Sequence, residues 1–174
     1  MKHGETMQDW EKVYDENANA LLLYARQWTG SLVDAEDAVQ EGFVKVCRSQ
    51  PQDPERIRPL LFKAVKWSAL DKLRKQRRRE QRETLVMETT PDAAWFESGL
   101  ENREFEEGIA HAMKQLPDEQ REVLVMKIWG GLSFKDIAET LDIPQGTAAS
   151  RYRYALDAVR EFLKPELNHG QQTL

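Results

Sequence analysis

The fold of this chain is decided by residues 116–160, LPDEQREVLVMKIWGGLSFKDIAETLDIPQGTAASRYRYALDAVR. The stretch reads as three helices joined by two short connections. Asp118 is suited to be the N-cap of the first helix, and Gly130-Gly131 is suited to end it. The apolar side of this helix is expected to comprise Val123, Leu124, Met126 and Ile128.

The second and third helices follow from capping signals. Ser133 and Asp136 have the spacing of a capping box, with the shorter Asp in place of Glu. The second helix is expected to bury Ile137, Ala138 and Leu141. Pro144 suits the first position of the third helix, which is predicted to run to about residue 163.

The third helix has two different sides. Its apolar stripe comprises Ala148, Tyr152, Ala155, Val159 and Phe162. The opposite side begins with small, polar and cationic residues, including Gly146, Ser150 and Arg153. A slim helix face that offers hydrogen-bond donors can enter the major groove of DNA, as in a helix-turn-helix. A small helical bundle with a merely solvated outer face has the same periodicity, so the pattern alone leaves both interpretations open.

Composition favours an all-α protein of two small helical domains. Of 174 residues, 40% are hydrophobic and 32% are charged, which is typical of small domains with large surfaces. No run of alternating apolar residues predicts a strand. The predicted domains are residues 1–82 and 99–165, with an acidic flexible linker at 83–98 and a tail at 166–174.

The single cysteine, Cys47, excludes an internal disulfide and is typical of a reducing compartment. No stretch is apolar over the ~18 residues that a membrane span requires, and the N-terminus has no signal-peptide core. We therefore expect a cytoplasmic protein without membrane insertion.

Charge is strongly segregated, although the net charge is −5. Residues 71–82 contain seven Lys or Arg and two acids, whereas residues 83–107 contain eight acids and one Arg. Such blocks indicate that different segments meet different surfaces, so the net charge does not exclude nucleic acid.

The first domain is predicted to contain helices at about 7–28, 34–48 and 58–81. In the second of these helices, Asp34, Asp37 and Glu41 share a face with Gln40. This acidic face could be a plain solvated surface, a protein-docking surface or a site for a hard metal ion. No histidine accompanies it.

The third helix of this domain has Phe62, Val65, Ala69 and Leu73 on its core side. Its opposite side carries Trp67 among Lys63, Asp71, Arg74 and Arg78. Aromatic rings among cations suit single-stranded nucleic acid, because bases stack on the rings and phosphates follow the charge. The alternative is that Trp67 packs on the first helix or on the linker.

Together these blocks resemble the sigma-70 family of bacterial RNA polymerase initiation factors, in particular its extracytoplasmic-function (ECF) group. The resemblance rests on DAEDAVQEGFVKV at 34–46, LLFKAVKWSALDKLRKQRRR at 60–79 and the stretch at 116–160. It implies a factor without catalytic activity, cofactor, metal or small-molecule substrate. Such a factor directs core RNA polymerase to −35/−10 promoters and helps melt the DNA.

The resemblance also implies partners and site residues. The partners are core polymerase, through the β′ coiled coil and the β flap, promoter DNA and an anti-sigma factor. The polymerase-binding residues would be Asp34, Asp37, Gln40, Glu41, Phe43 and Val44. The −10 strand would be held by the 50–59 loop and by Arg56, Lys63, Lys66, Trp67, Asp71, Arg74, Lys75, Arg77 and Arg78. The −35 element would be read by Ser133, Lys135, Gln145, Gly146, Thr147, Ala149, Ser150, Arg151, Arg153 and Tyr154.

The sequence departs from the family pattern in three places. Trp67 stands where many members have Asn. Ala148-Ala149 replaces a frequent Val-Lys, and Tyr154 replaces a common Arg. The last two changes weaken the attraction to phosphate.

Two other functions remain as alternatives. A dimeric helix-turn-helix regulator would account for residues 116–160, but it would leave the acidic face and the Trp67 helix without a role. A magnesium-dependent nuclease would use Asp34, Asp37 and Glu41.

Overall fold

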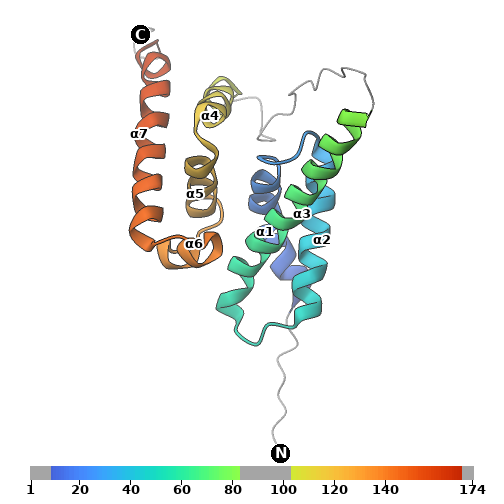
Figure 1. The fold of residues 1–174 in the computed structure, drawn as a ribbon. Coiled ribbons are helices and arrows are strands. Elements are labelled where there is room, and N and C mark those ends of the chain that lie inside the picture. The colour runs from blue at the N-terminus through green and yellow to red at the C-terminus, as the bar shows by residue number, and fades with distance from the viewer. Residues whose placement is uncertain (1–8, 83–102, 170–174) are drawn as a thin grey trace, which may run out of the picture.

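The protein is described by a computed structural model that defines residues 9–82 and 103–169. All regular elements in these ranges are helices, which confirms the all-α prediction (Figure 1). The N-terminal half comprises α1 (Trp10–Ala25), α2 (Leu32–Ser49) and α3 (Pro54–Arg82). The C-terminal half comprises α4 (Arg103–Gln115), α5 (Asp118–Ile128), α6 (Phe134–Leu141) and α7 (Gln145–His169). The predicted linker at 83–98 lies outside the described residues.

Helix α3 begins earlier than predicted because the loop before it provides the necessary signals. Gln50 ends α2 in the left-handed conformation, with φ of 45°. The Asp53 carboxylate accepts a hydrogen bond from the backbone N–H of Glu55, at 3.0 Å. Pro54 occupies the first helical position, where its missing N–H costs nothing. Pro59, where the sequence suggested a start, is instead inside the helix.

The N-termini of α5 and α6 differ in how they are capped. Asp118 was predicted as the N-cap of α5, but it is the first helical residue, and Pro117 occupies the cap position without a side-chain bond. The Asp118 carboxylate pairs with Arg121 instead. The capping box is confirmed: the Ser133 hydroxyl accepts from the Asp136 N–H at 3.1 Å, and the Asp136 carboxylate accepts from the Ser133 N–H at 3.3 Å.

Helix α5 is buried on several sides, contrary to the predicted single apolar stripe. Residues 123–126 are at most 1% exposed, and Glu122 is 5% exposed. The reason is that α5 packs against α7 of its own half and against α1 of the other half. Ile128, predicted to be buried, is 48% exposed.

Helix α7 extends beyond the predicted end, to His169. Ala148 and Ala155 are fully buried, as the predicted stripe requires, but Phe162 is 44% exposed. The buried part of the stripe therefore ends before Phe162, although the helix continues.

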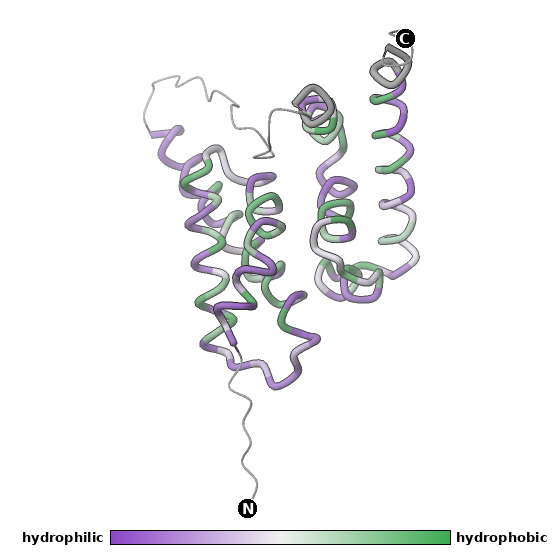
Figure 2. Tube along the Cα trace, turned by 180° about the vertical axis from the view of Figure 1, so that it is seen from behind, coloured by the Kyte–Doolittle hydropathy of each residue, from purple (hydrophilic) through white to green (hydrophobic). Residues whose placement is uncertain are grey.

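The two halves share one hydrophobic core. Figures 1 and 2 show the two groups of helices side by side. Helix α3 packs against α6 as well as against its own neighbours α1 and α2. Gly130 allows a close approach: a Cβ atom there would lie 2.7 Å from the Phe62 ring. Phe62 in turn packs edge-on against Tyr24, with ring centroids 5.1 Å apart.

Gly42 lets α2 approach α3, and its replacement tests this packing. A Cβ at position 42 would lie 2.7 Å from Val65 Cγ2 and 2.8 Å from the Val65 backbone nitrogen. Gly42→Ala should therefore lower the free energy of unfolding by about 1–3 kcal/mol through overpacking. Urea denaturation measures this value.

Gly146→Ala is the matched control, because nothing lies within 4 Å of a Cβ at that helical position. It should leave stability unchanged or raise it by up to ~1 kcal/mol through helix propensity. Equal stabilities of the two variants would contradict the close approach of α2 and α3.

Candidate protein-docking and nucleic-acid sites

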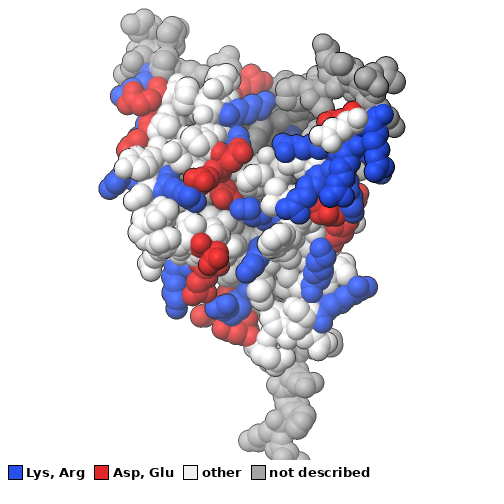
Figure 3. Space-filling view, in the orientation of Figure 1, with Lys and Arg blue, Asp and Glu red and all other residues white. Residues whose placement is uncertain are grey.

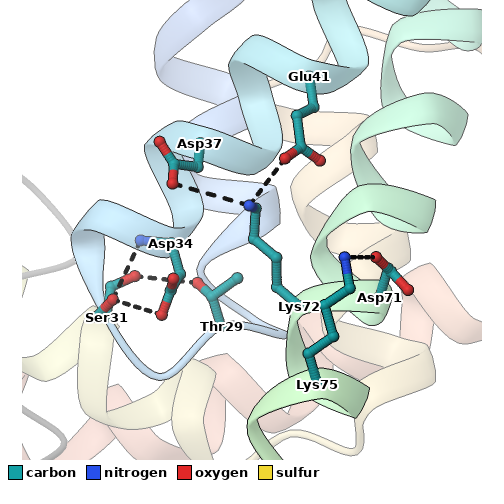
Figure 4. Close-up of polar contacts among 8 residues, drawn as sticks. All are labelled: Thr29, Ser31, Asp34, Asp37, Glu41, Asp71, Lys72 and Lys75. Carbon is teal, nitrogen blue, oxygen red and sulfur yellow. Dashed lines mark hydrogen bonds and ion pairs between the residues drawn. The ribbon is translucent and has the colours of Figure 1, made fainter.

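The acidic face of α2 is organised by a lysine from α3 (Figure 4). The Lys72 ammonium lies 3.0 Å from a Glu41 carboxylate oxygen and 3.8 Å from an Asp37 oxygen. The Lys72 side chain is 18% exposed, whereas both carboxylates are about half exposed. Lys72 thus holds two carboxylates side by side while they remain open to a partner.

Lys72 belongs to the basic run at 71–82, in which its neighbours Arg74 and Lys75 were predicted to hold the −10 strand. Its different role has a signal in the sequence, because it lies one helical turn after the buried Ala69. That spacing puts it at the edge of the core stripe.

Asp34 differs from the other members of the acidic face. Its carboxylate accepts a hydrogen bond from the Ser31 hydroxyl at 2.8 Å, and that hydroxyl accepts from the Asp34 N–H at 3.1 Å (Figure 4). Asp34 therefore completes the N-terminal cap of α2 and is half-buried. Across the described residues, no three His, Cys, Asp or Glu side chains are arranged to hold a metal ion.

Phe43 and Val44 sit beside this face in different environments. The Phe43 ring packs edge-on against Trp10 and Tyr14, with centroids 5.8 and 5.1 Å apart. Val44 is 45% exposed. Phe43 fixes α1 against α2, and Val44 presents an apolar side chain to solvent next to the carboxylates.

Trp67 leaves 57% of its surface exposed on α3, so packing on α1 does not account for it. The other alternative, packing on the linker, concerns residues outside the described ranges. Lys63, one turn earlier, is exposed as well. Figure 3 shows Lys and Arg side chains gathered over the C-terminal part of α3. The exposed arginines of this part that were predicted to hold DNA are Arg74, Arg77 and Arg78.

Asp71 and Lys75 neutralise each other on this surface. Their side chains are 2.8 Å apart, one helical turn from each other (Figure 4). The hydrogen bond from Lys75 lowers the pKa of Asp71, and the same bond raises the pKa of Lys75. Asp71 therefore stays ionised at neutral pH, and the free positive charge of this segment rests on the arginines.

Two predicted −10 contacts pair with acids of the C-terminal half, although Arg56 remains 56% exposed. The Lys66 ammonium lies 2.7 Å from a Glu122 carboxylate oxygen, and it also lies 5.2 Å from the centre of the Trp28 ring. The Arg56 guanidinium lies 3.0 Å from a Glu139 oxygen. Both cations are occupied by acids of α5 and α6 in this arrangement.

Tyr24 completes the environment of Glu122. Its hydroxyl donates to the same carboxylate oxygen at 3.2 Å. Burial, with the nearby Glu122 charge and this hydrogen bond, raises the pKa of Tyr24 well above its ordinary value. The phenol consequently keeps its proton and remains a donor. Neither Tyr24, Glu122 nor Glu139 was predicted from the sequence as a site residue.

The predicted −35 residues divide between structural and accessible roles. Arg151 pairs with Glu119 of α5 at 2.8 Å and is 23% exposed, so it faces the bundle. The Arg153 guanidinium lies 5.3 Å from the centre of the Tyr154 ring, and Tyr154 is 55% exposed. The other accessible members are Lys135, Gln145 and Gly146.

The remaining members of this set are less accessible or serve the fold. Thr147, Ala149 and Ser150 are half-buried. The Ser150 hydroxyl donates to the Gly146 carbonyl at 2.9 Å, and Ser133 belongs to the capping box. In the part of the chain that the structure defines, no helix combines the length and apolarity needed to cross a membrane.

Two family models match the two halves of the chain. Residues 13–79 match sigma-70 region 2, and residues 106–159 match sigma-70, region 4. The ECF RNA polymerase sigma factor SigL of Mycobacterium tuberculosis is 32% identical over 154 residues, which cover 85% of each chain. The RNA polymerase sigma-E factor of Streptomyces avermitilis is 27% identical over 171 residues, covering 94% of this chain and 89% of that protein.

A solved structure shares the fold. It is the co-crystal structure of the sigma factor RpoE with the anti-sigma factor NepR from Bartonella quintana, with a TM-score of 0.68 and 22% identity. The match covers 90% of this chain and 98% of that chain. With both sigma-70 regions in order and relatives of this similarity, the chain belongs to the ECF group of the sigma-70 family.

Proposed function

We propose that this protein is a transcription initiation factor that binds core RNA polymerase, directs it to −35/−10 promoters and promotes melting of the −10 region. One observation carries the proposal beyond family membership. The chain presents an acidic docking face on α2 and an exposed tryptophan among arginines on α3, together with a helix-turn-helix. A dimeric DNA-binding regulator needs only the last of these.

The docking face for polymerase is formed by Asp37, Gln40, Glu41 and Val44. Half-exposed carboxylates beside an apolar side chain suit a protein surface of complementary charge, because the charges orient the partner and the apolar group is buried on contact. Lys72 and the capping role of Asp34 pre-orient this face. The partner is the β′ coiled coil, and the C-terminal half contacts the β flap.

The −10 site is centred on Trp67. An unstacked base can stack on its exposed ring while Lys63 and the α3 arginines follow the phosphates, which offsets the cost of unpairing. Base capture of this kind opens DNA without a catalysed reaction. Asp71 and Lys75 contribute no net charge here, since they pair with each other.

The −35 site is the start of α7. Gln145 and Gly146 form its slim leading edge, and Arg153 and Tyr154 are the accessible side chains further along. Arg153 supplies a donor to base edges or phosphate, and the Tyr154 ring supplies an apolar surface. Lys135 of α6 contacts the DNA backbone. The protein acts in the cytoplasm, where an anti-sigma factor holds it inactive.

The function is tested by run-off transcription with purified core polymerase on the DNA upstream of the protein's own gene. Addition of the protein should produce a discrete transcript and should make the protein co-purify with core. If it neither binds core nor supports a transcript, and instead binds duplex DNA alone as a dimer, the regulator alternative replaces this proposal.

Trp67→Ala should reduce run-off transcription from duplex DNA about 5- to 150-fold, because stacking of one base on an aromatic ring contributes about 1–3 kcal/mol. Trp67→Phe should restore most of the activity, since it retains an aromatic face. A template with a pre-melted −10 region should be less affected than duplex DNA. An equal loss of affinity for core polymerase would assign Trp67 to packing or docking.

Glu41→Arg should weaken binding to core polymerase about tenfold, because the new cation faces Lys72 and opposes the charge of the docking face. Circular dichroism should show unchanged helicity. Glu16→Arg is the control with the same change of charge, since Glu16 is an exposed acid of another helix, α1. If the two variants bind core polymerase with equal affinity, Glu41 does not belong to the docking face.

A further inference from the structure

The inner side of the first half of α7 is built mostly from alanine. Ala148 and Ala155 lie seven residues apart on this side and are fully buried. Such short side chains let α7 approach its neighbours closely, but they offer little shape that could resist rotation of the helix about its axis. Tyr152 lies between them on the same stripe, and its ring packs edge-on against Phe134 of α6, with centroids 5.5 Å apart. The contact between these two rings therefore resists that rotation.

A lysine of α5 holds Phe134 in place. The Lys127 ammonium lies 4.7 Å from the centre of the Phe134 ring, and it donates a hydrogen bond to the Leu132 carbonyl at 3.0 Å. The Leu132 N–H donates in turn to the Met126 carbonyl at 3.1 Å. Both polar groups of the Leu132 backbone are thus tied to α5, two residues before Phe134. Lys127 is half-buried, and these two contacts compensate its partial loss of water.

The other ionic contact between α5 and this part of α7 is more exposed. Arg151 pairs with Glu119 at 2.8 Å, but the Glu119 side chain is 68% exposed. An ion pair that is open to water on one side is a weak constraint. The half-buried contacts that run from Lys127 through Phe134 to Tyr152 constrain α7 more strongly.

Rotation of α7 matters because its outer side carries the candidate −35 residues. Gly146 and Arg153 are seven residues apart, so they share that side, and Arg153 directly follows Tyr152 in the chain. Side chains lie about 5–6 Å from a helix axis, so a rotation of about 20° moves them by about 2 Å. Hydrogen-bond distances vary by only about 0.5 Å. Such a rotation would consequently break a bidentate contact between Arg153 and a guanine.

We infer that Lys127 is a positioning residue of the −35 site. Through the Phe134 ring and Tyr152 it sets the rotation of α7, and hence the direction in which Arg153 meets the major groove. The inference rests on the proposed function and deepens its −35 site. Lys127 acts from behind the recognition helix, through the turn between α5 and α6, and makes no contact with DNA itself.

The test measures how strongly transcription depends on the −35 element. Run-off transcription with core polymerase is compared on two templates: the DNA upstream of the protein's own gene, and the same DNA with its −35 element replaced. The ratio of the two yields is the −35 discrimination. Lys127→Met removes the ammonium but keeps an apolar side chain of similar length. Lys127→Arg keeps a cation that can donate to a carbonyl and stack on a ring.

Lys164→Met is the matched control, because it makes the same change at an exposed lysine of α7 that pairs with Glu161. Lys127→Met should lower the −35 discrimination at least about fivefold, the smallest factor expected for loss of one bidentate base contact. Lys127→Arg should restore most of the discrimination, and Lys164→Met should equal the parent protein. Affinity for core polymerase should be the same in all four proteins.

A double substitution tests whether Lys127 acts through the ring. Phe134→Leu keeps an apolar side chain but removes the ring face, so it should lower the −35 discrimination by a similar factor. Adding Lys127→Met to Phe134→Leu should then lower it little further, because the two residues belong to one chain of contacts. If urea denaturation shows that Lys127→Met is unfolded, Phe134→Leu alone must lose discrimination while keeping its affinity for core polymerase.

Two results would overturn the inference. One is a Lys127→Met protein with the discrimination of the parent. The other is an equal loss on both templates, which would make Lys127 a phosphate contact or a purely structural residue, since a phosphate contact weakens binding to all sequences alike. Failure of the proposed function looks different: the parent protein itself would give no transcript, or its transcript would not depend on the −35 element.

Discussion

The buried carboxylate of Glu122 is the constraint on which the arrangement of this molecule depends. An ionised group that is 5% exposed, next to four buried apolar residues, is tolerated only if its charge is paired. Both partners, Lys66 and Tyr24, come from the other half of the chain. The pair therefore specifies which face of α5 meets α1 and α3, and this orientation, more than added stability, is its main contribution.

This constraint divides the candidate functional surfaces into two classes. The α2 carboxylates, Trp67 and the α3 arginines face solvent while the halves are packed together. Lys66 and Arg56 face the boundary. The first class faces solvent in the packed arrangement, whereas Lys66, 27% exposed, is paired with Glu122, and Arg56, although 56% exposed, is paired with Glu139. One helix, α3, carries residues of both classes on adjacent sides.

Local sequence patterns were sufficient for most elements and for the exposure of several candidate site residues. Helical periodicity correctly separated Trp67 from the core stripe of α3, and side-chain spacing identified the capping box of α6. These features depend on residues within about four positions of each other. The acidic face was also recognised, although the capping role of Asp34 was not, because carboxylates that dock and carboxylates that cap have the same local pattern.

The contacts between the two halves, which the sequence did not reveal, depend on distant residues. Lys66 and Glu122 are 56 positions apart, and Arg56 and Glu139 are 83 apart. Periodicity describes the faces of one helix and does not identify the partner of each face, so the second buried side of α5 was missed. The residues around Glu122 contained no signal for its partners, because Arg121 precedes it and the apolar run of α5 begins only at Val123.

The departures from the family pattern in α7 have different consequences once burial is known. Ala148 is fully buried, so its small size concerns the packing of α7 and not the reading of DNA. Ala149 is half-buried and Tyr154 is exposed, so only these two changes remove charge from a surface that DNA can reach.

Arg151, Arg160 and Lys164 are each engaged by a carboxylate. Attraction to phosphate in the C-terminal half therefore depends mainly on Lys135 and Arg153, and the larger cationic surface is on α3. On the proposed assignment of these sites, we expect the −10 side to contribute more of the salt-dependent binding than the −35 side, because counterion release scales with the number of phosphates neutralised.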